Sequence, residues 1–343
     1  MEMLRFAFVL FFSLAISVSA SDTSSFHFET ARALYSAGQY TAALAQLDQS
    51  AGIAEPAPDR ELFRGLCLAQ LDRWTEARAP LARATAASPL NAEAWYWLGA
   101  SDYYLHDYDR AMDSLDKAIR LNPRDGDAYR MRGLVHLQRN RWNEGYLDWA
   151  KAVQLNPRDV KTLNYIGQLF HEAGRCDQAK LYLEDAVKVD PKHVEALTYL
   201  GLCEERLANP ERAAQLYQRA IAAGTAAGKP YSWAYLSLAK LWRNSGRSDD
   251  ARALLDSAAV LAPEPSLLYT LAQIQFEANQ TAAAETNLRH ALEANPNLNE
   301  AHYLLSRVLA AQGRRAESRA ELEKFRIAKQ TAKPTPKVTV VAR

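Results

Sequence analysis

The sequence has little of what metal centres, haem attachment and covalent catalysis require. Its 343 residues include only three cysteines and seven histidines, and none of them forms a C-x-x-C, C-x-x-C-H or H-E-x-x-H motif. There is also no G-x-S-x-G nucleophile motif and no glycine-rich phosphate loop. We therefore expect no metal site, no cofactor and no catalytic residues, and the sequence predicts a protein that is not an enzyme.

An excess of charge of either sign is also missing. The chain has 41 lysines and arginines against 40 aspartates and glutamates, so its formal net charge is +1. Proteins that bind nucleic acids usually carry a basic patch that neutralises phosphates. The balance gives no electrostatic reason to expect a nucleic acid, and a protein or peptide is the expected partner.

An apolar run lies at the N-terminus, from Phe6 to Val18, after the single positive charge of Arg5. Small residues then precede Ser21, so the pattern predicts a secretory signal peptide over residues 1–20 with cleavage after Ala20. The alternative is an uncleaved membrane anchor, but the run is shorter than the roughly 20 residues that a span needs. We expect an exported protein, periplasmic or secreted, or alternatively in the lumen of the endoplasmic reticulum, with no membrane span in the mature chain.

The stretch from Ala92 to Asp125 predicts two antiparallel helices followed by a stop, because apolar residues recur at helical spacing in both halves. Its key residues are Trp95, Leu98, Gly99, Ala111, Leu115, Ala118 and Pro123. Gly99 and Ala111 are small, which lets two helix backbones approach closely, and a larger side chain there would overpack the contact by about 1–3 kcal/mol. Pro123 ends the second helix, because proline has no N–H group and disfavours helix in the residue before it.

The same letters return every 34 residues, a spacing that Pro89, Pro123, Pro157 and Pro191 keep. One such hairpin cannot bury its own apolar faces and needs a neighbour on each side. Alignment of the turns and prolines gives repeats 1–6 over residues 24–231 and repeats 7–9 over residues 232–325. Residues 326–343 are expected to form the end of a capping helix and a flexible basic tail.

This pattern resembles the tetratricopeptide repeat, which reads W-x2-L-G-x2-Y, then A-x3-F, then P over 34 residues. The matching residues are Trp95, Leu98, Gly99, Ala111 and Pro123, whereas the tyrosine position holds aspartate at residue 102. The resemblance implies an all-α fold, a right-handed superhelix (an α-α solenoid) of about nine helix-turn-helix repeats.

Aromatic residues recur early in the second helix of successive repeats, at Tyr40, Trp74, Tyr108 and Trp142. We interpret them as packing residues.

Two irregularities leave alternatives open. The segment Ala222–Tyr231 contains two glycines and a proline, and it predicts either a tolerated loop insertion or a hinge between repeats 1–6 and 7–9. Cys176 and Cys203 lie in adjacent repeats, where a disulfide would be sterically accessible in an exported protein. The odd cysteine count argues against a disulfide framework.

The resemblance also implies where a partner would bind. In the tetratricopeptide family, positions 2, 5, 9, 12 and 13 of the first helix line the concave surface. Carried over residue by residue, repeats 3 to 5 give the candidate partner-binding residues Tyr96, Tyr103, Tyr104, Arg130, Lys161, Asn164, Gln168 and His171. Repeat 7 offers Trp233, Lys240 and Arg243 at the same positions. The charge clamp with which some family members hold a peptide C-terminus is not complete in any three successive repeats.

Three functions follow as hypotheses. The leading one is an exported, non-enzymatic scaffold that binds a peptide or partner protein in its concave groove and mediates complex assembly. The first alternative is a periplasmic or luminal chaperone-like holdase, and the second is a docking subunit for a separate enzyme.

Overall fold

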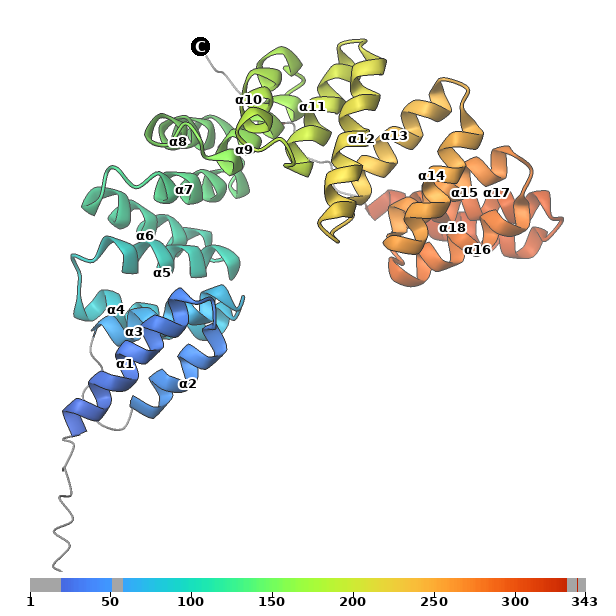
Figure 1. Ribbon diagram of the computed structural model, residues 1–343. Coiled ribbons are helices and arrows are strands. Elements are labelled where there is room, and N and C mark those ends of the chain that lie inside the picture. Colours follow the sequence, from blue (N-terminus) through green and yellow to red (C-terminus); the bar gives the residue numbers. More distant parts are fainter. Residues whose placement is uncertain (1–19, 51–57, 332–337, 339–343) are drawn as a thin grey trace, which may run out of the picture. The chain divides into compact units, whose positions relative to one another are not determined.

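The computed structural model describes residues 20–50, residues 58–331 and Val338. The predicted signal peptide, apart from Ala20, and all of the tail beyond Thr331 except Val338 lie outside the described residues. The described residues form eighteen α-helices and no β-strand (Figure 1).

The helices follow one another in antiparallel pairs, each made of an odd-numbered A helix and an even-numbered B helix (Figure 1). Eight pairs are α1 (Ala20–Ser36) with α2 (Tyr40–Ser50), α3 (Pro58–Gln70) with α4 (Trp74–Ala87), α5 (Ala92–Tyr104) with α6 (Tyr108–Leu121), α9 (Val160–Glu172) with α10 (Cys176–Val189), α11 (Val194–Arg206) with α12 (Pro210–Ala226), α13 (Ser232–Asn244) with α14 (Ser248–Leu261), α15 (Pro265–Glu277) with α16 (Thr281–Ala294), and α17 (Asn299–Ala311) with α18 (Arg315–Thr331). In the sequence, α7 (Gly126–Gln138) and α8 (Trp142–Leu155) are the two helices of the remaining repeat. The helices thus correspond to the nine predicted repeats.

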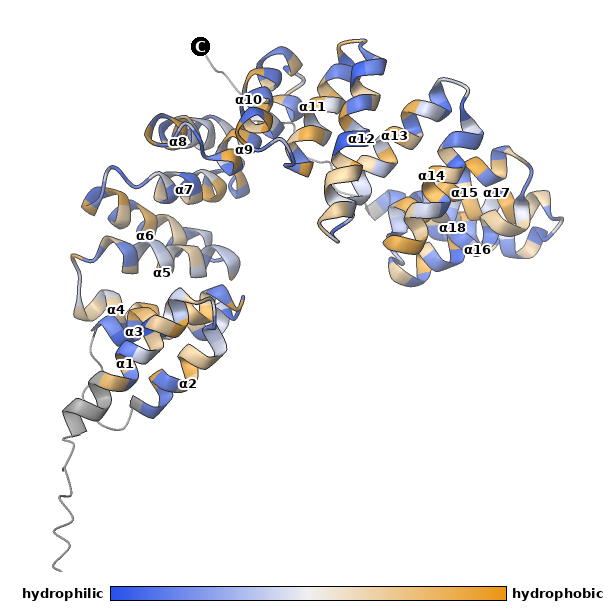
Figure 2. Cartoon of the chain, viewed as in Figure 1, coloured by the Kyte–Doolittle hydropathy of each residue, from blue (hydrophilic) through white to orange (hydrophobic). Residues whose placement is uncertain are grey.

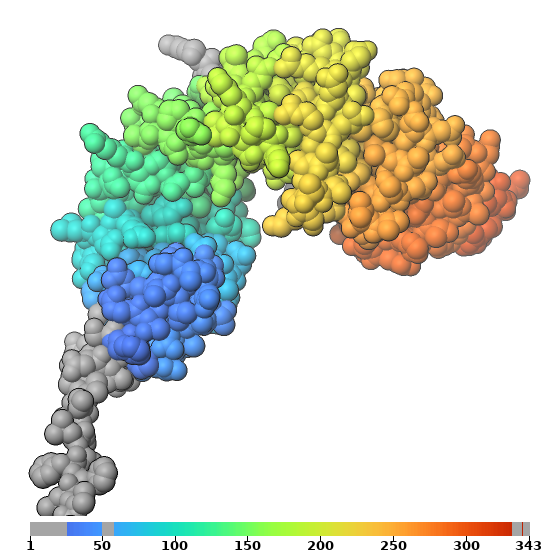
Figure 3. Space-filling view, in the orientation of Figure 1, coloured from blue at the N-terminus to red at the C-terminus, as the bar shows by residue number. Residues whose placement is uncertain are grey.

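The chain divides into two compact units, each described here by itself. Unit 1 ends at Val135 and unit 2 begins at His136, so the boundary falls within α7. Within each unit, the surfaces of successive repeats adjoin one another (Figure 3). The predicted division between repeats 6 and 7 lies inside unit 2 and stays a prediction.

In repeats 2, 3, 5 and 6 the A and B helices touch through a glycine on the A helix. A Cβ atom on Gly99 would lie 2.7 Å from Leu115 Cγ, and one on Gly167 would lie 2.4 Å from Leu183 Cγ. Real Cβ atoms essentially never come that close to another heavy atom. The sequence prediction that a small residue is required at this position is therefore confirmed.

Five of the described B helices, α4, α6, α10, α14 and α16, each bury a stripe of alanine and leucine. In α10, Ala179, Leu183 and Ala186 have no solvent-exposed surface. Figure 2 shows hydrophobic and hydrophilic residues interleaved along the helices. Burying one leucine stabilises the fold by about 1.5–3 kcal/mol. Because the stripe recurs in successive repeats, stability accumulates along the chain and does not depend on one large core.

Each A helix is followed by one residue in the left-handed backbone conformation, which turns the chain into the B helix. These residues are Gly38, Asp72, His106, Asn140, Gly174, Ala208, Gly246, Asn279 and Gly313. Glycine adopts this conformation freely, and asparagine and aspartate adopt it readily. Ala208, with a φ of 62°, has no such advantage and stores about 1 kcal/mol of strain.

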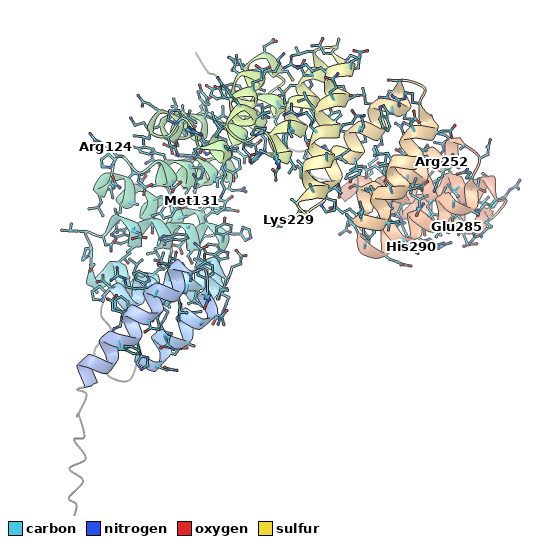
Figure 4. All side chains as sticks on the ribbon, viewed as in Figure 1. Arg124, Met131, Lys229, Arg252, Glu285 and His290 are labelled. Atoms are coloured by element: carbon cyan, nitrogen blue, oxygen red, sulfur yellow. The ribbon has the colours of Figure 1, made fainter. Side chains whose placement is uncertain are left out.

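The sequence predicts a loop over Ala222–Tyr231, and this prediction is wrong for the first half of the segment. Helix α12 continues to Ala226 and has 17 residues, against 14 in α10. Alanine is the strongest helix former, which explains the extension. Gly228, with a φ of 65°, then ends the helix, and the N–H of Lys229 donates to the carbonyl of Gly224 at 2.9 Å (Figure 4). The insertion therefore lengthens a helix, and the hinge stays a prediction.

The tyrosine position of the repeat pattern holds buried carboxylates in two repeats. In unit 1, Asp102 is 2% exposed and lies 2.8 Å from Arg78 Nε of the preceding B helix. In unit 2, Glu204 is fully buried, and its Oε1 lies 2.9 Å from Lys180 Nζ and 3.0 Å from Arg212 Nε. Burial raises the pKa of Asp102. Burial also acts to raise the pKa of Glu204, but Lys180, Asn209 and Arg212 together hold it below its ordinary value.

Candidate functional site

Three consecutive A helices of unit 2 bring an imidazole and two aromatic rings into one row. The His171 ring on α9 meets the Tyr199 ring on α11 edge to face, with centroids 5.5 Å apart, and Tyr199 meets Trp233 on α13 at 5.4 Å. Trp233 is 45% exposed, whereas Tyr199 is 6% exposed. A buried tyrosine thus supports an exposed tryptophan, and such a supported aromatic ring loses little conformational entropy when a partner covers it.

His171 is held in its neutral form. Burial of the imidazole, together with the positive charge of Arg206, lowers its pKa from 6.5 to about 4. The Arg206 guanidinium donates to the His171 backbone carbonyl at 3.1 Å. The His171 Nδ1 atom is buried and has no hydrogen-bond partner among the described residues. The histidine therefore acts as an aromatic group rather than as a cation at neutral pH.

The row continues along α13 and onto the next A helix, α15, with a hydrogen-bonded polar group. Arg243 on α13 donates to Gln273 Oε1 on α15 at 3.3 Å, and Gln273 Nε2 donates to the Tyr269 hydroxyl at 2.8 Å. Burial raises the pKa of Tyr269, so its hydroxyl keeps its proton. We call the surface formed by His171, Tyr199, Trp233, Arg243 and Gln273 the A-helix face of unit 2.

Unit 1 carries a second group of rings, where α3 and α5 meet the starts of their B helices. The Tyr104 ring stacks on Trp74 with centroids 4.2 Å apart and an interplanar angle of 17°. Tyr103 contacts both Tyr104 and Tyr108, at 5.3 Å and 5.9 Å, and the Tyr108 hydroxyl lies 2.9 Å from His106 Nδ1. Trp74 and Tyr108 are the first residues of α4 and α6. The interpretation of these two rings as packing residues fits their contacts.

The structure places four predicted partner-binding residues in unit 1. Tyr104 is 47% exposed, and Tyr96, Tyr103 and Arg130 are half-buried. Tyr96 packs against Trp97 at 5.2 Å, and burial raises its pKa to about 12. The Arg130 guanidinium pairs with Asp127 at 2.5 Å and lies close enough to Tyr96 to act on its pKa. Tyr104 is thus the most exposed of these four residues.

The other four predicted residues lie along α9 in unit 2. Lys161 is exposed, and Gln168 and His171 are half-buried. Asn164 is only 4% exposed, and its side-chain oxygen has no hydrogen-bond partner among the described residues. Asn164 therefore offers little surface in this conformation, and its role in partner binding stays a prediction.

The concave positions carried over from the family include Trp233 but not Tyr199. The five concave positions carried over from the family include position 2, which is Trp233, but Tyr199 is at position 6 of its repeat. Contacts with the A helices on both sides bring it into the row.

The described residues contain no group of three or more histidine, cysteine, aspartate or glutamate side chains that could hold a metal ion. None of the helices in the described ranges has the length and apolar character needed to cross a membrane. The three cysteines are free thiols and buried. Cys203 lies against Cys176, and burial together with this contact raises the pKa of the Cys203 thiol.

Models of one repeat family match segments along much of the chain. A family model described as tetratricopeptide repeat matches residues 28–92, 64–101, 166–229 and 269–332, which together are more than half of the sequence. Two further models with the same description match residues 92–125 and 232–257. No curated protein sequence matches the chain.

Solved structures share the fold at low sequence identity. The Cut9–Hcn1 hetero-tetramer of the APC/C is 17% identical, with a TM-score of 0.58 over 86% of this chain and 57% of that chain. The human IFIT1 dimer with m7Gppp-AAAA is also 17% identical, with a TM-score of 0.52 over 88% of this chain and 80% of that chain. This chain therefore spans little more than half the length of the first of these relatives, and the similarity concerns the fold alone.

Proposed function

The chain belongs to the tetratricopeptide-repeat family, and from this premise we propose that it is a non-catalytic scaffold that binds an extended peptide segment of a partner protein. The proposed binding surface is the A-helix face of unit 2. Binding there would hold the partner in a complex, so the proposed role is assembly.

The observation that carries this proposal is the row formed by His171, Tyr199 and Trp233. Packed helices lie about 8–10 Å apart, and an extended chain rises about 3.3 Å per residue. About three residues of a bound peptide would therefore correspond to each repeat. Tryptophan and tyrosine dominate the binding energy of many interfaces, because each combines a large contact area with little entropy loss.

The polar part of the face supports an extended ligand. Each residue of an extended peptide presents an N–H and a C=O group that needs a hydrogen-bond partner when it is buried. Gln273, Arg243 and the protonated Tyr269 hydroxyl supply donors along the same row. Peptide-binding surfaces of this kind combine apolar contact with a few directed hydrogen bonds.

The net charge of the chain favours a peptide over a nucleic acid as the ligand. The chain has 41 basic and 40 acidic residues, whereas nucleic-acid affinity depends on neutralising several phosphates. The m7Gppp-AAAA in the human IFIT1 structure is a ligand of that protein.

Two further parts of the proposal concern unit 1 and the compartment. We propose that Tyr96, Tyr103, Tyr104 and Arg130 form a second contact for the same partner, with the exposed Tyr104 contributing most. We also propose export through the signal peptide at residues 1–20, to the periplasm or the exterior, on the sequence pattern alone.

Site-specific photo-crosslinking in the native host tests the proposed surface. A photoreactive amino acid replaces Trp233, and the matched control replaces Leu181, which is 64% exposed on helix α10. We expect the probe at position 233 to capture a discrete partner, and the probe at 181 not to capture it. Equal capture at both positions would remove the A-helix face from the proposal. A broad smear of unfolded chains at both positions would favour the holdase alternative.

A further inference from the structure

A cavity of about 390 Å³ lies between α15 and α17, at the C-terminal end of the A-helix face. Its apolar wall is formed by Phe276 and Leu304, and its polar wall includes Gln273, Glu277 and Arg307. The cavity is large enough for one or two amino-acid side chains, and it is open on one side. It therefore offers an apolar surface and a cation to the same ligand group.

The cation in this cavity is not neutralised. The Arg307 guanidinium lies over the Phe276 ring, 5.2 Å from its centroid, and has no carboxylate within 4 Å among the described residues. Arginines on the neighbouring B helices are paired: Arg252 with Asp249 at 3.0 Å and Arg289 with Glu285 at 2.7 Å. Figure 4 labels Arg252 on α14 and Glu285 on α16.

Two more cations extend the positive surface toward α13. Lys240 on α13 is exposed and, within the part of the chain that the structure describes, also lacks a carboxylate within 4 Å. Arg243 has only a distant contact with Glu277, at 3.9 Å, and the Glu277 side chain is 59% exposed. Glu277 is therefore hydrated and only weakly held at the rim of the cavity. The surface from Lys240 to Arg307 keeps positive charge that a partner could neutralise.

We propose that this cavity binds an acidic residue that neighbours an apolar residue in the peptide partner. The carboxylate would accept hydrogen bonds from the Arg307 guanidinium, whose planar fork matches carboxylate geometry. The apolar neighbour would cover Phe276 and Leu304. This inference rests on the proposed peptide-binding function, and it adds the chemical class of the segment that is recognised.

The proposed source of the carboxylate is an aspartate or glutamate side chain within the peptide. The free C-terminus of the partner would place a similar planar anion on Arg307, and the test excludes it. Synthetic peptides with an amidated C-terminus distinguish them, because amidation removes the terminal carboxylate and leaves the side chains unchanged.

Selection from a phage library of random linear peptides of about twelve residues tests the inference, because an extended peptide of that length spans several repeats. The purified chain is compared with three variants: Arg307→Gln, the matched control Arg289→Gln on α16, and Trp233→Ala. Circular dichroism checks that each variant is folded. We expect wild type and Arg289→Gln to enrich peptides with an aspartate or glutamate beside an apolar residue.

The Arg307→Gln variant should lose this enrichment. A selected synthetic peptide should also bind it about tenfold or more weakly, the effect of losing one charge-assisted hydrogen bond. Replacing the acidic residue of that peptide with its amide should have the same effect on wild type and no further effect on Arg307→Gln. If C-terminal amidation alone weakens binding, the recognised group is the chain terminus, and the proposed acidic residue is wrong.

The outcomes separate this inference from the proposed function. The inference would be overturned if the enriched peptides depend on Trp233 but show no preference for an acidic residue. It would also be overturned if Arg307→Gln enriches the same acidic peptides as wild type. In both cases the peptide-binding function would still hold. Failure to enrich any peptide above background would count against both.

Discussion

His171 should make the stability of the protein depend on pH between about pH 4 and pH 6.5. Its pKa is lowered from 6.5 to about 4 by burial against Tyr199 and by the charge of Arg206. An unfolded chain would expose the same imidazole to water, where its pKa returns to about 6.5. Between these two values the unfolded state binds more protons than the folded state, so stability rises with pH.

The size of the effect follows from the two pKa values. The difference corresponds to at most about 3 kcal/mol, because water around the half-buried ring screens part of the effect. This stability is fully lost below about pH 4 and fully regained above pH 6.5. That is a large part of the 5–15 kcal/mol that stabilises a typical domain. The variant His171→Phe keeps a ring against Tyr199 but cannot bind a proton. It should therefore lack this component of the pH dependence.

Urea unfolding of wild type and His171→Phe across this pH range measures the difference. We expect the two proteins to have stabilities within about 1 kcal/mol of each other above pH 6.5. Near pH 4 the variant should be the more stable by about 2–3 kcal/mol. The control His290→Gln changes an exposed histidine on α16 (Figure 4) and should leave the wild-type pH profile unchanged. Parallel pH profiles for wild type and His171→Phe would refute the reasoning, as would an NMR titration that places the His171 pKa near 6.5.

Three further predictions concern packing and can be measured by urea unfolding. Ala208→Gly should stabilise the protein by about 0.5–1 kcal/mol, because it relieves the left-handed strain at φ 62°; a loss of stability would show that the turn is not strained. Gly167→Ala should destabilise it by about 1–2 kcal/mol in spite of the higher helix propensity of alanine, because the new Cβ would lie 2.4 Å from Leu183 Cγ; a neutral result would contradict the close contact. Lys180→Met should lower the stability of the protein by about 2 kcal/mol, because it weakens the pairing of the fully buried Glu204. Adding Glu204→Met should recover part of that stability. A double variant less stable than Lys180→Met would contradict this prediction.

The repeat architecture could be predicted because its rules are local and recur. Gly99 and Leu115 are a fixed distance apart in sequence and meet in the structure, and the same pair returns as Gly167 and Leu183. Periodicity therefore carries information about tertiary contacts, which is unusual for a single sequence.

Departures from the pattern were harder to predict. Ala208 occupies a left-handed position that favours glycine, because the helix-to-helix connection fixes the backbone whatever the residue. The first half of the segment Ala222–Tyr231 was expected to be a loop because of its glycines, but helix propensity and packing against the following residues extend α12 instead. In both places tertiary context overrides the local signal.

The residues of the candidate site also could be predicted only in part, because their exposure depends on tertiary context. The family positions include Trp233 and His171, and they also include Asn164, which is buried. They do not include Tyr199, whose ring contacts both His171 and Trp233. Position numbers describe an average repeat, whereas exposure depends on the side chains of the neighbouring repeats. The uncompensated charge of Arg307 could not be found from sequence either, because it depends on which carboxylates lie within reach in space.

The central claim is that the A-helix face of unit 2 binds a peptide segment through Trp233. The most direct measurement is the dissociation constant of the captured partner segment for wild type, Trp233→Ala and Leu181→Ala. Removing an interface tryptophan should weaken binding by about tenfold or more, and removing the exposed leucine on α10 should leave it unchanged. Unchanged affinity for Trp233→Ala, or a loss confined to Leu181→Ala, would contradict the claim.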